Sequence, residues 1–278
     1  MIWRCRSRDL RLDTGPLLMG IVNVTPDSFS DGGRYDTTDT ALARALELAG
    51  EGADIIDIGG ESTRPGAAGV TAEQEIDRVV PVVAALARRT DVPVSVDTYK
   101  SAVAQRCLDA GASVINDISG LRFDPAMAGI AARYHAGLVL MHIKGTPQDM
   151  QRDPVYEDLL GEIASYLQGA IEIALAAGVE RSAIAIDPGI GFGKTVAHNL
   201  TILKDLRHFE RLDCPMVIGV SRKSFIGKLN DGVPADQRLP GSIAAALAAI
   251  AAGAAVLRVH DVAATRQAVA THRAIAGA

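Results

Sequence analysis

The feature that most constrains this chain is a regular alternation of apolar, strand-like runs with segments that have the composition and length of helices. The strand-like runs end near Asn23, Asp57, Asp97, Asn116, Met141, Asp187, Gly219 and Arg258. Amphipathic or alanine-rich segments follow them at 38–52, 71–89, 100–110, 125–135, 156–177, 198–210, 242–252 and 263–276. Eight strands alternating with eight helices predict an α/β protein, a (β/α)₈ TIM barrel of parallel strands inside a ring of helices.

The alternative architecture is an open, doubly wound sheet, which seldom contains eight such units without a second domain. No linker or domain boundary is apparent between the repeated units, so we expect a single domain over residues 1–278. Residues 1–15 precede the first barrel strand. We predict that they form a short hairpin that plugs the N-terminal face of the barrel.

Composition narrows the class of protein. The net charge is −5, and no basic patch suits a nucleic-acid backbone, so we expect no nucleic-acid partner. No apolar run is long and isolated enough to span a bilayer, and the basic first residues lack the apolar core of a secretory signal. Three scattered cysteines without a CxxC pair indicate reduced thiols and no zinc site. We therefore expect a cytoplasmic protein with small-molecule partners and no membrane association.

Polar residues stand at the predicted strand ends, where a barrel interior would otherwise require apolar ones. The active site of such a barrel lies at the carboxyl ends of its strands. A single buried Asn or Asp is commonly a satisfied core residue, but a converging set is difficult to explain by structure alone. The set comprises Asn23, Asp97, Asn116, Asp187, Arg258 and His260. The run GIGFGKT at 189–195 imitates a phosphate loop, but that motif needs glycine where Pro188 stands.

Two long polar loops follow strand-like runs: NVTPDSFSDGG at 23–33 and GGESTRP at 59–65. Together with DPGIGFGK at 187–194, SRKS at 221–224 and RVH at 258–260, they resemble the dihydropteroate synthase family over almost the whole chain. Departures are small, such as Lys144 where the family commonly has Arg.

The resemblance implies a transferase of folate biosynthesis and a sulfonamide target. It would condense 6-hydroxymethyl-7,8-dihydropterin pyrophosphate with p-aminobenzoate to give 7,8-dihydropteroate and pyrophosphate. The family's pterin contacts map onto Asp97, Asn116, Ile118, Met141, Asp187, Phe192, Lys223 and Arg258. Its pyrophosphate contacts map onto Asn23, Thr63, Arg258 and His260, with Asn23 also the ligand of Mg²⁺. Its p-aminobenzoate pocket maps onto Phe29, Ser62, Thr63, Arg64, Pro65, Lys223 and Ser224.

The implied reaction needs no protein nucleophile, because pyrophosphate leaves readily once Mg²⁺ and cations neutralise it. Catalysis is then expected to rest on Asp97, Lys223, Arg258 and His260, with Arg258 and His260 as the cations of the anion site. Orientation of the arylamine toward the pterin methylene supplies the remaining part of the catalysis.

Two alternatives stay open at this point. Pterin-dependent methyltransferases share the barrel but lack the STRP, SRKS and RxH elements that are present here. A non-catalytic paralogue that binds a pterin-like ligand would retain the same motifs. We also expect a homodimer built from the late helices, because the alanine-rich segment 242–252 permits close helix packing.

Overall fold

The computed structural model describes residues 1–25, 34–63, 66 and 69–278, of which 34–37 are described by their backbone alone. The barrel strands are β3 (Leu17–Asn23), β4 (Ile55–Gly59), β5 (Val94–Asp97), β6 (Val114–Asp117), β7 (Gly137–Met141), β8 (Ile184–Asp187), β9 (Val217–Ile218) and β10 (Val256–Val259). The α-helices are α1 (Arg34–Gly50), α2 (Ala72–Ala87), α3 (Ser101–Asp109), α4 (Met127–Tyr134), α5 (Leu159–Ala176), α6 (Val196–Lys204), α7 (Ser224–Leu229), α8 (Leu239–Ala251) and α9 (Val262–Ala276). Three short 3₁₀ helices complete this described set: η2 (Arg181–Ala183), η3 (Leu206–Leu212) and η4 (Ala235–Gln237).

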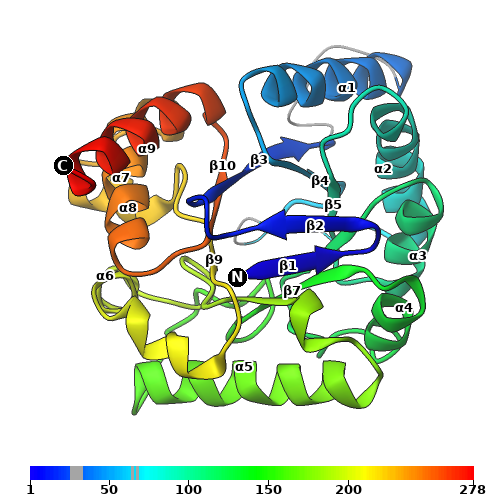
Figure 1. Cartoon of the computed structure of the whole chain (residues 1–278). Coiled ribbons are helices and arrows are strands. Elements are labelled where there is room, and N and C mark those ends of the chain that lie inside the picture. The colour runs from blue at the N-terminus through cyan, green and yellow to red at the C-terminus, as the bar shows by residue number, and fades with distance from the viewer. Residues whose placement is uncertain (26–33, 64–65, 67–68) are drawn as a thin grey trace.

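Within the described residues, the eight strands form one parallel sheet in the order β8-β7-β6-β5-β4-β3-β10-β9. The ring closes where Ile186 of β8 bridges Met216, next to β9. The helices surround the strands (Figure 1). The predicted TIM barrel is therefore confirmed, and its parallel strands bring all their carboxyl ends to one face.

Local sequence signals explain where several helices start and stop. Thr71 caps α2, and its hydroxyl and the Gln74 side chain form a reciprocal capping box with the backbone, as the spacing of these residues suggests. The helical segment expected at 198–210 is interrupted at Asp205, so that α6 ends there and η3 follows. The barrel position of each strand end is unaffected by this break.

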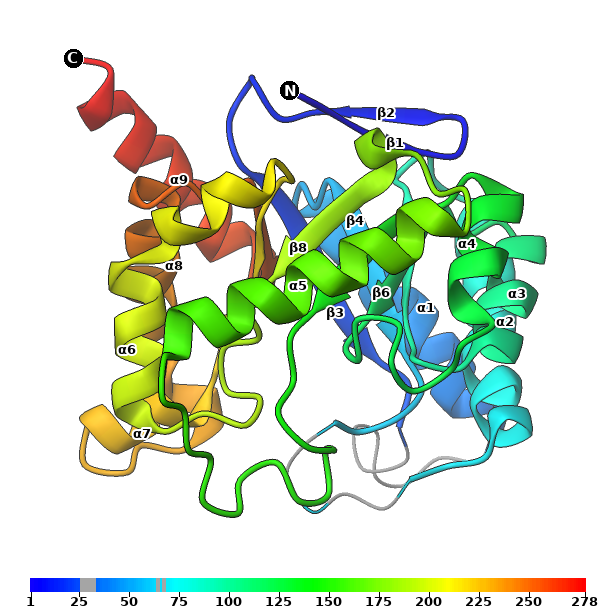
Figure 2. The ribbon, with the colours of Figure 1, turned by 90° about the horizontal axis from the view of Figure 1, so that it is seen from below.

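The N-terminal residues form the predicted hairpin, from β1 (Ile2–Cys5) and β2 (Arg8–Arg11), which pair antiparallel. It covers the end of the barrel opposite α7 (Figure 2). Trp3 is fully buried, and its Nε1 donates a hydrogen bond of 2.8 Å to the carbonyl oxygen of Ala183. Trp3 and Cys5 pack against inward-facing strand residues, among them Met19, Ile55, Val139 and Val256. The hairpin thus completes the apolar interior at the closed face.

Helix α5 is the one described helix long and apolar enough, by length and composition, to cross a membrane. One of its sides supplies Ile163, Leu167, Ile171 and Ala174 to the main core cluster of the barrel. Its other side carries polar residues, including the half-buried Gln168 and the exposed Glu172, and Gln168 donates a hydrogen bond to Glu172. This division of faces is that of a helix covering a barrel.

We predict that Trp3→Ala lowers the free energy of unfolding by about 3–5 kcal/mol, because it removes a large buried side chain and its hydrogen bond. Urea unfolding followed by circular dichroism measures this change. Ile2→Ala is the matched control, since Ile2 lies on the same strand with half its surface exposed, and it should change stability by less than about 1 kcal/mol. Equal effects of the two substitutions would show that the hairpin does not depend on the buried indole.

Candidate functional site

The open end of the barrel, its mouth, is organised by Arg258 at the end of β10. Its Nε donates to Asp57 Oδ2 at 2.6 Å, and its Nη2 donates to Asp97 Oδ2 at 2.7 Å. Asn116 Nδ2 donates to the same Asp57 oxygen at 3.1 Å. Strand register explains the meeting, because Asp97 pairs with Gly59 on one side and Asn116 on the other. A β-carbon at Gly59 would lie 3.4 Å from the Asp97 β-carbon, which is van der Waals distance, so the strand end packs directly against Asp97.

Burial sets the protonation of this cluster. Removal from water raises the pKa of Asp97 to about 7; the charge of Arg258 opposes the shift, and the second carboxylate, Asp57, adds to it. The carboxylates in turn raise the pKa of Arg258, so this side chain stays charged. One guanidinium therefore faces two carboxyl groups, and the raised pKa lets Asp97 hold a proton up to near-neutral pH.

The next group of predicted residues lines the neighbouring strand ends. Asp187 is buried and accepts a 2.7 Å hydrogen bond from the backbone N–H of Gly189 on Oδ1. Lys223 lies with its Nζ 4.1 Å from the centre of the Phe192 ring. Burial lowers the pKa of Lys223 to about 8, while Asp187 acts in the opposite direction. Ile118 and Met141 belong to a small apolar cluster against which Phe192 packs.

Lys194, at the end of the loop that imitates a phosphate motif, is held by groups of the protein itself. It is buried, and its Nζ lies 2.8 Å from His142 Nδ1 and 2.9 Å from the carbonyl oxygen of Phe192. Burial lowers its pKa well below the ordinary value. Lys194 therefore ties the loop that carries Phe192 to the end of β7, in agreement with the rejection of a phosphate loop.

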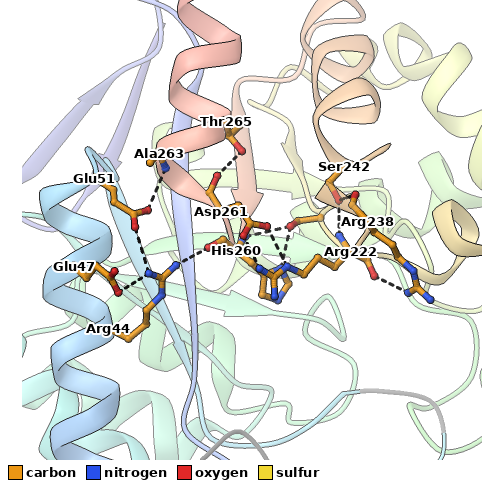
Figure 3. A network of polar contacts seen from close by, with 11 residues as sticks. Arg44, Glu47, Glu51, Arg222, Arg238, Ser242, His260, Asp261, Ala263 and Thr265 are labelled. Atoms are coloured by element: carbon orange, nitrogen blue, oxygen red, sulfur yellow. Dashed lines mark hydrogen bonds and ion pairs between the residues drawn. The ribbon is translucent and has the colours of Figure 1, made fainter. Parts of the chain in front are cut away.

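His260, which follows β10, differs from the expectation that it is a resident cation. Its Nδ1 lies 3.0 Å from Ser221 Oγ, and its backbone carbonyl accepts a hydrogen bond from Arg44 (Figure 3). Burial, reinforced by the charge of Arg258, lowers the pKa of His260 to about 3. The imidazole is thus neutral near pH 7, and it meets a ligand as a hydrogen-bonding group. Among the two expected cations, Arg258 alone carries permanent charge.

The remaining predicted residues lie around this cluster or outside the described part of the chain. Asn23 ends β3, is half-buried, and its carboxamide forms no hydrogen bond to another described residue. Ser62 and Thr63 follow β4 and are half-buried, whereas Ser224 opens α7 and is exposed. Phe29, Arg64 and Pro65 fall outside the described residues. No group of three or more His, Cys, Asp or Glu side chains suited to a metal occurs among the residues described.

The structure adds residues that the sequence analysis did not select. Asp57 is completely buried, and its Oδ1 has no hydrogen-bond partner in the described structure. Glu61, at the start of the segment that carries Ser62 and Thr63, accepts hydrogen bonds from Tyr99 and from Lys100. Lys100 also donates to Glu75 at 2.5 Å. An acid inside the apolar run IIDIG was the available signal for Asp57; Glu61 and Lys100 become visible only once the strands are placed.

Comparisons with known proteins agree on one family. The family described as pterin binding enzymes matches residues 19–260. A dihydropteroate synthase of Bacillus subtilis is 48% identical over 246 residues, covering 88% of this chain and 84% of the relative. The Xanthomonas albilineans dihydropteroate synthase with 4-aminobenzoic acid has a TM-score of 0.94 at 45% identity, covering 100% of this chain and 98% of the other. The same enzyme in complex with 7,8-dihydropteroate has a TM-score of 0.91 at 42% identity, with both chains fully covered.

We predict that the Asp97 carboxyl titrates near pH 7 and that Asp57→Asn lowers this pKa, because Arg258 then has one carboxylate fewer to share. Since the folded-state pKa lies above the ordinary 3.8, the associated stabilisation is full below about pH 4 and is lost as the pH rises through about 7. Carboxyl ¹³C NMR measures both values, with Asp97→Asn identifying the resonance. An Asp97 pKa that stays near 4, or that rises in Asp57→Asn, would contradict this electrostatic description.

Proposed function

The chain belongs to the dihydropteroate synthases, a family of pterin-binding enzymes, and we propose that its barrel mouth carries out their condensation reaction. The chain is a transferase that joins 6-hydroxymethyl-7,8-dihydropterin pyrophosphate to p-aminobenzoate, giving 7,8-dihydropteroate and pyrophosphate. The observation that carries this conclusion is the set of hydrogen-bonding groups gathered at the strand ends, in a chain that aligns with the family over 19–260.

The hydrogen-bonding groups left unused at the mouth suit a pterin ring, because the edge of that ring alternates donors and acceptors. Asp187 uses Oδ1 for the backbone of Gly189, which leaves Oδ2 to accept from the pterin amino group and a ring N–H. Asn116 uses one N–H for Asp57, which leaves its carbonyl oxygen and its second N–H for ring nitrogens. Lys223 supplies a donor for the pterin carbonyl. Ile118, Met141 and Phe192 provide apolar walls for the ring faces.

Arg258 and Asp97 are the groups best placed to support bond cleavage. The guanidinium of Arg258 stacks on the pterin and attracts the pyrophosphate, while it remains tethered to Asp57 and Asp97. In its ionised form, Asp97 stabilises positive charge that develops on the ring as the methylene C–O bond breaks. The p-aminobenzoate nitrogen then forms the new C–N bond and loses a proton to solvent. The neutral imidazole of His260 hydrogen-bonds to the departing pyrophosphate.

Mg²⁺ fits this mouth as an ion shared with the substrate. The carboxamide of Asn23, which has no hydrogen-bond partner among the described residues, offers one hard oxygen. Mg²⁺ requires several, so the substrate's phosphate oxygens would complete the set. When bound, the ion neutralises the pyrophosphate and makes it a better leaving group. The p-aminobenzoate pocket is proposed on Ser62, Thr63, Lys223 and Ser224 of the described chain, together with Phe29, Arg64 and Pro65.

The proposal extends to assembly and location. Helix α8 has the sequence LPGSIAAALAAIA, and its small residues favour close packing of a second copy against the late helices. We propose a homodimer through this region, which light scattering at micromolar concentration tests directly. The cytoplasmic location expected from the sequence stays a prediction.

The proposed reaction predicts that pyrophosphate and dihydropteroate form in equal amounts, and only when Mg²⁺ and p-aminobenzoate are both present. A coupled assay of pyrophosphate release, with chromatography of the pterin product, measures this. Arg258→Met should lower kcat/KM by about 100-fold or more, because it removes the charge that faces the leaving group.

Two results would contradict the assignment. Tight binding of the pterin pyrophosphate without any product would identify a non-catalytic paralogue. Methyl transfer in place of condensation would identify the pterin-dependent methyltransferase reaction.

A further inference from the structure

The turn between β9 and α7 is held in a costly backbone conformation at Arg222. This residue has φ 58°, in the left-handed region that non-glycine residues seldom adopt. Its backbone N–H donates to Ser242 Oγ at 2.9 Å, and its carbonyl accepts from Arg238 Nη1 at 3.0 Å. The backbone of Arg222 is therefore fixed on both sides by α8 and the residue that precedes it.

The side chain of Arg222 fixes the same turn to the neighbouring strand end. Its Nη2 lies 2.5 Å from Asp261 Oδ1, and its Nε lies 3.1 Å from Asp261 Oδ2, which makes a two-point ion pair (Figure 3). Such paired contacts restrict geometry more than a single ion pair does. Arg222 thus joins the loop after β9 to the loop after β10.

The two residues of this pair directly adjoin two residues of the mouth. Lys223 follows Arg222 in the chain, and His260 precedes Asp261. Ser221 Oγ adds a second link, since it accepts a 3.2 Å hydrogen bond from the His260 backbone. Arg44 of α1 holds the carbonyl of His260 from the other side at 3.0 Å (Figure 3). The positions of Lys223 and His260 are therefore set relative to each other by contacts outside the mouth.

From this arrangement we propose that Arg222 and Asp261 are positioning residues. They set the position of the pterin half of the substrate relative to its pyrophosphate half. This inference rests on the proposed function. Lys223 holds the pterin ring, and His260 meets the pyrophosphate. The C–O bond that breaks lies between those halves, so its alignment depends on how the two loops are placed.

The proposal has a specific energetic consequence. Each half of the substrate can bind to its own loop even when the two loops shift slightly against each other. Alignment of the reacting bond tolerates much less, since displacements near 1 Å can reduce rates by about 100-fold. Loss of the ion pair should therefore lower kcat and leave the affinity for either half nearly unchanged.

Asp261→Asn is the decisive variant, because it removes the charge while keeping a residue that is equally suited to the position before α9. Asp13→Asn is the matched control: Arg11 and Asp13 form a comparable two-point pair on the exposed N-terminal segment, far from the mouth. Steady-state turnover gives kcat, and calorimetry gives Kd for 6-hydroxymethylpterin and for pyrophosphate with Mg²⁺ separately.

We expect Asp261→Asn to lower kcat by about tenfold or more, with both Kd values within about twofold of the wild type, and Asp13→Asn to change none of these. Unchanged kcat in a folded Asp261→Asn protein would overturn the proposal. So would a loss of affinity for one half that equals the loss in kcat, because it would indicate direct binding.

Arg222→Lys serves as the second variant, because it keeps the charge but not the two-point contact. It should give a smaller loss of kcat in the same direction, and unchanged kcat in this variant also overturns the proposal. Wild-type turnover in the same assay tests the proposed function independently. Absence of wild-type turnover would refute the proposed reaction, whereas the ratio of the variant kcat to the wild-type kcat reports on the ion pair.

Discussion

The mouth of this barrel depends on one buried guanidinium shared by two carboxyl groups. Arg258 bridges Asp57 on β4 and Asp97 on β5, and Asp57 also fixes the amide of Asn116 on β6. Removing one partner of a buried ion pair leaves an uncompensated charge, which is strongly unfavourable. Three strand ends and β10 are therefore held in one arrangement, and the hydrogen-bonding groups available to a ligand are those that this arrangement leaves free.

The same burial determines the charge that a ligand meets. It raises the pKa of Asp97 and lowers those of Lys223 and His260, so each group moves toward its neutral form. A mouth with few permanent charges and many directed hydrogen-bonding groups suits a flat heterocycle better than a free anion. In the proposed reaction, attraction of the pyrophosphate then falls mainly to Arg258 and to the proposed Mg²⁺.

Most of the fold follows from the alternation of apolar strands and helical segments, because period and length leave few other architectures. The strand-end residues Asp97, Asn116, Asp187 and Arg258 could be selected for the same reason: polarity at the end of a buried strand is informative. Asp57 could not be selected as a site residue from the sequence, because its partner Arg258 lies 201 residues away and their contact depends on barrel closure. The neutral state of His260 was equally inaccessible, because it follows from burial and from the nearby Arg258 rather than from local sequence.

The most direct test of this account is the pterin affinity of Asp57→Asn, a substitution at a residue that touches Arg258 and Asn116 from beneath the mouth. Asp54→Asn in the same segment is the control, because Asp54 binds Leu18 N–H and Arg266 instead. Calorimetry with 6-hydroxymethylpterin should show affinity at least tenfold weaker in Asp57→Asn and unchanged in Asp54→Asn. Wild-type affinity in a folded Asp57→Asn protein would contradict the claim that the shared guanidinium organises the site.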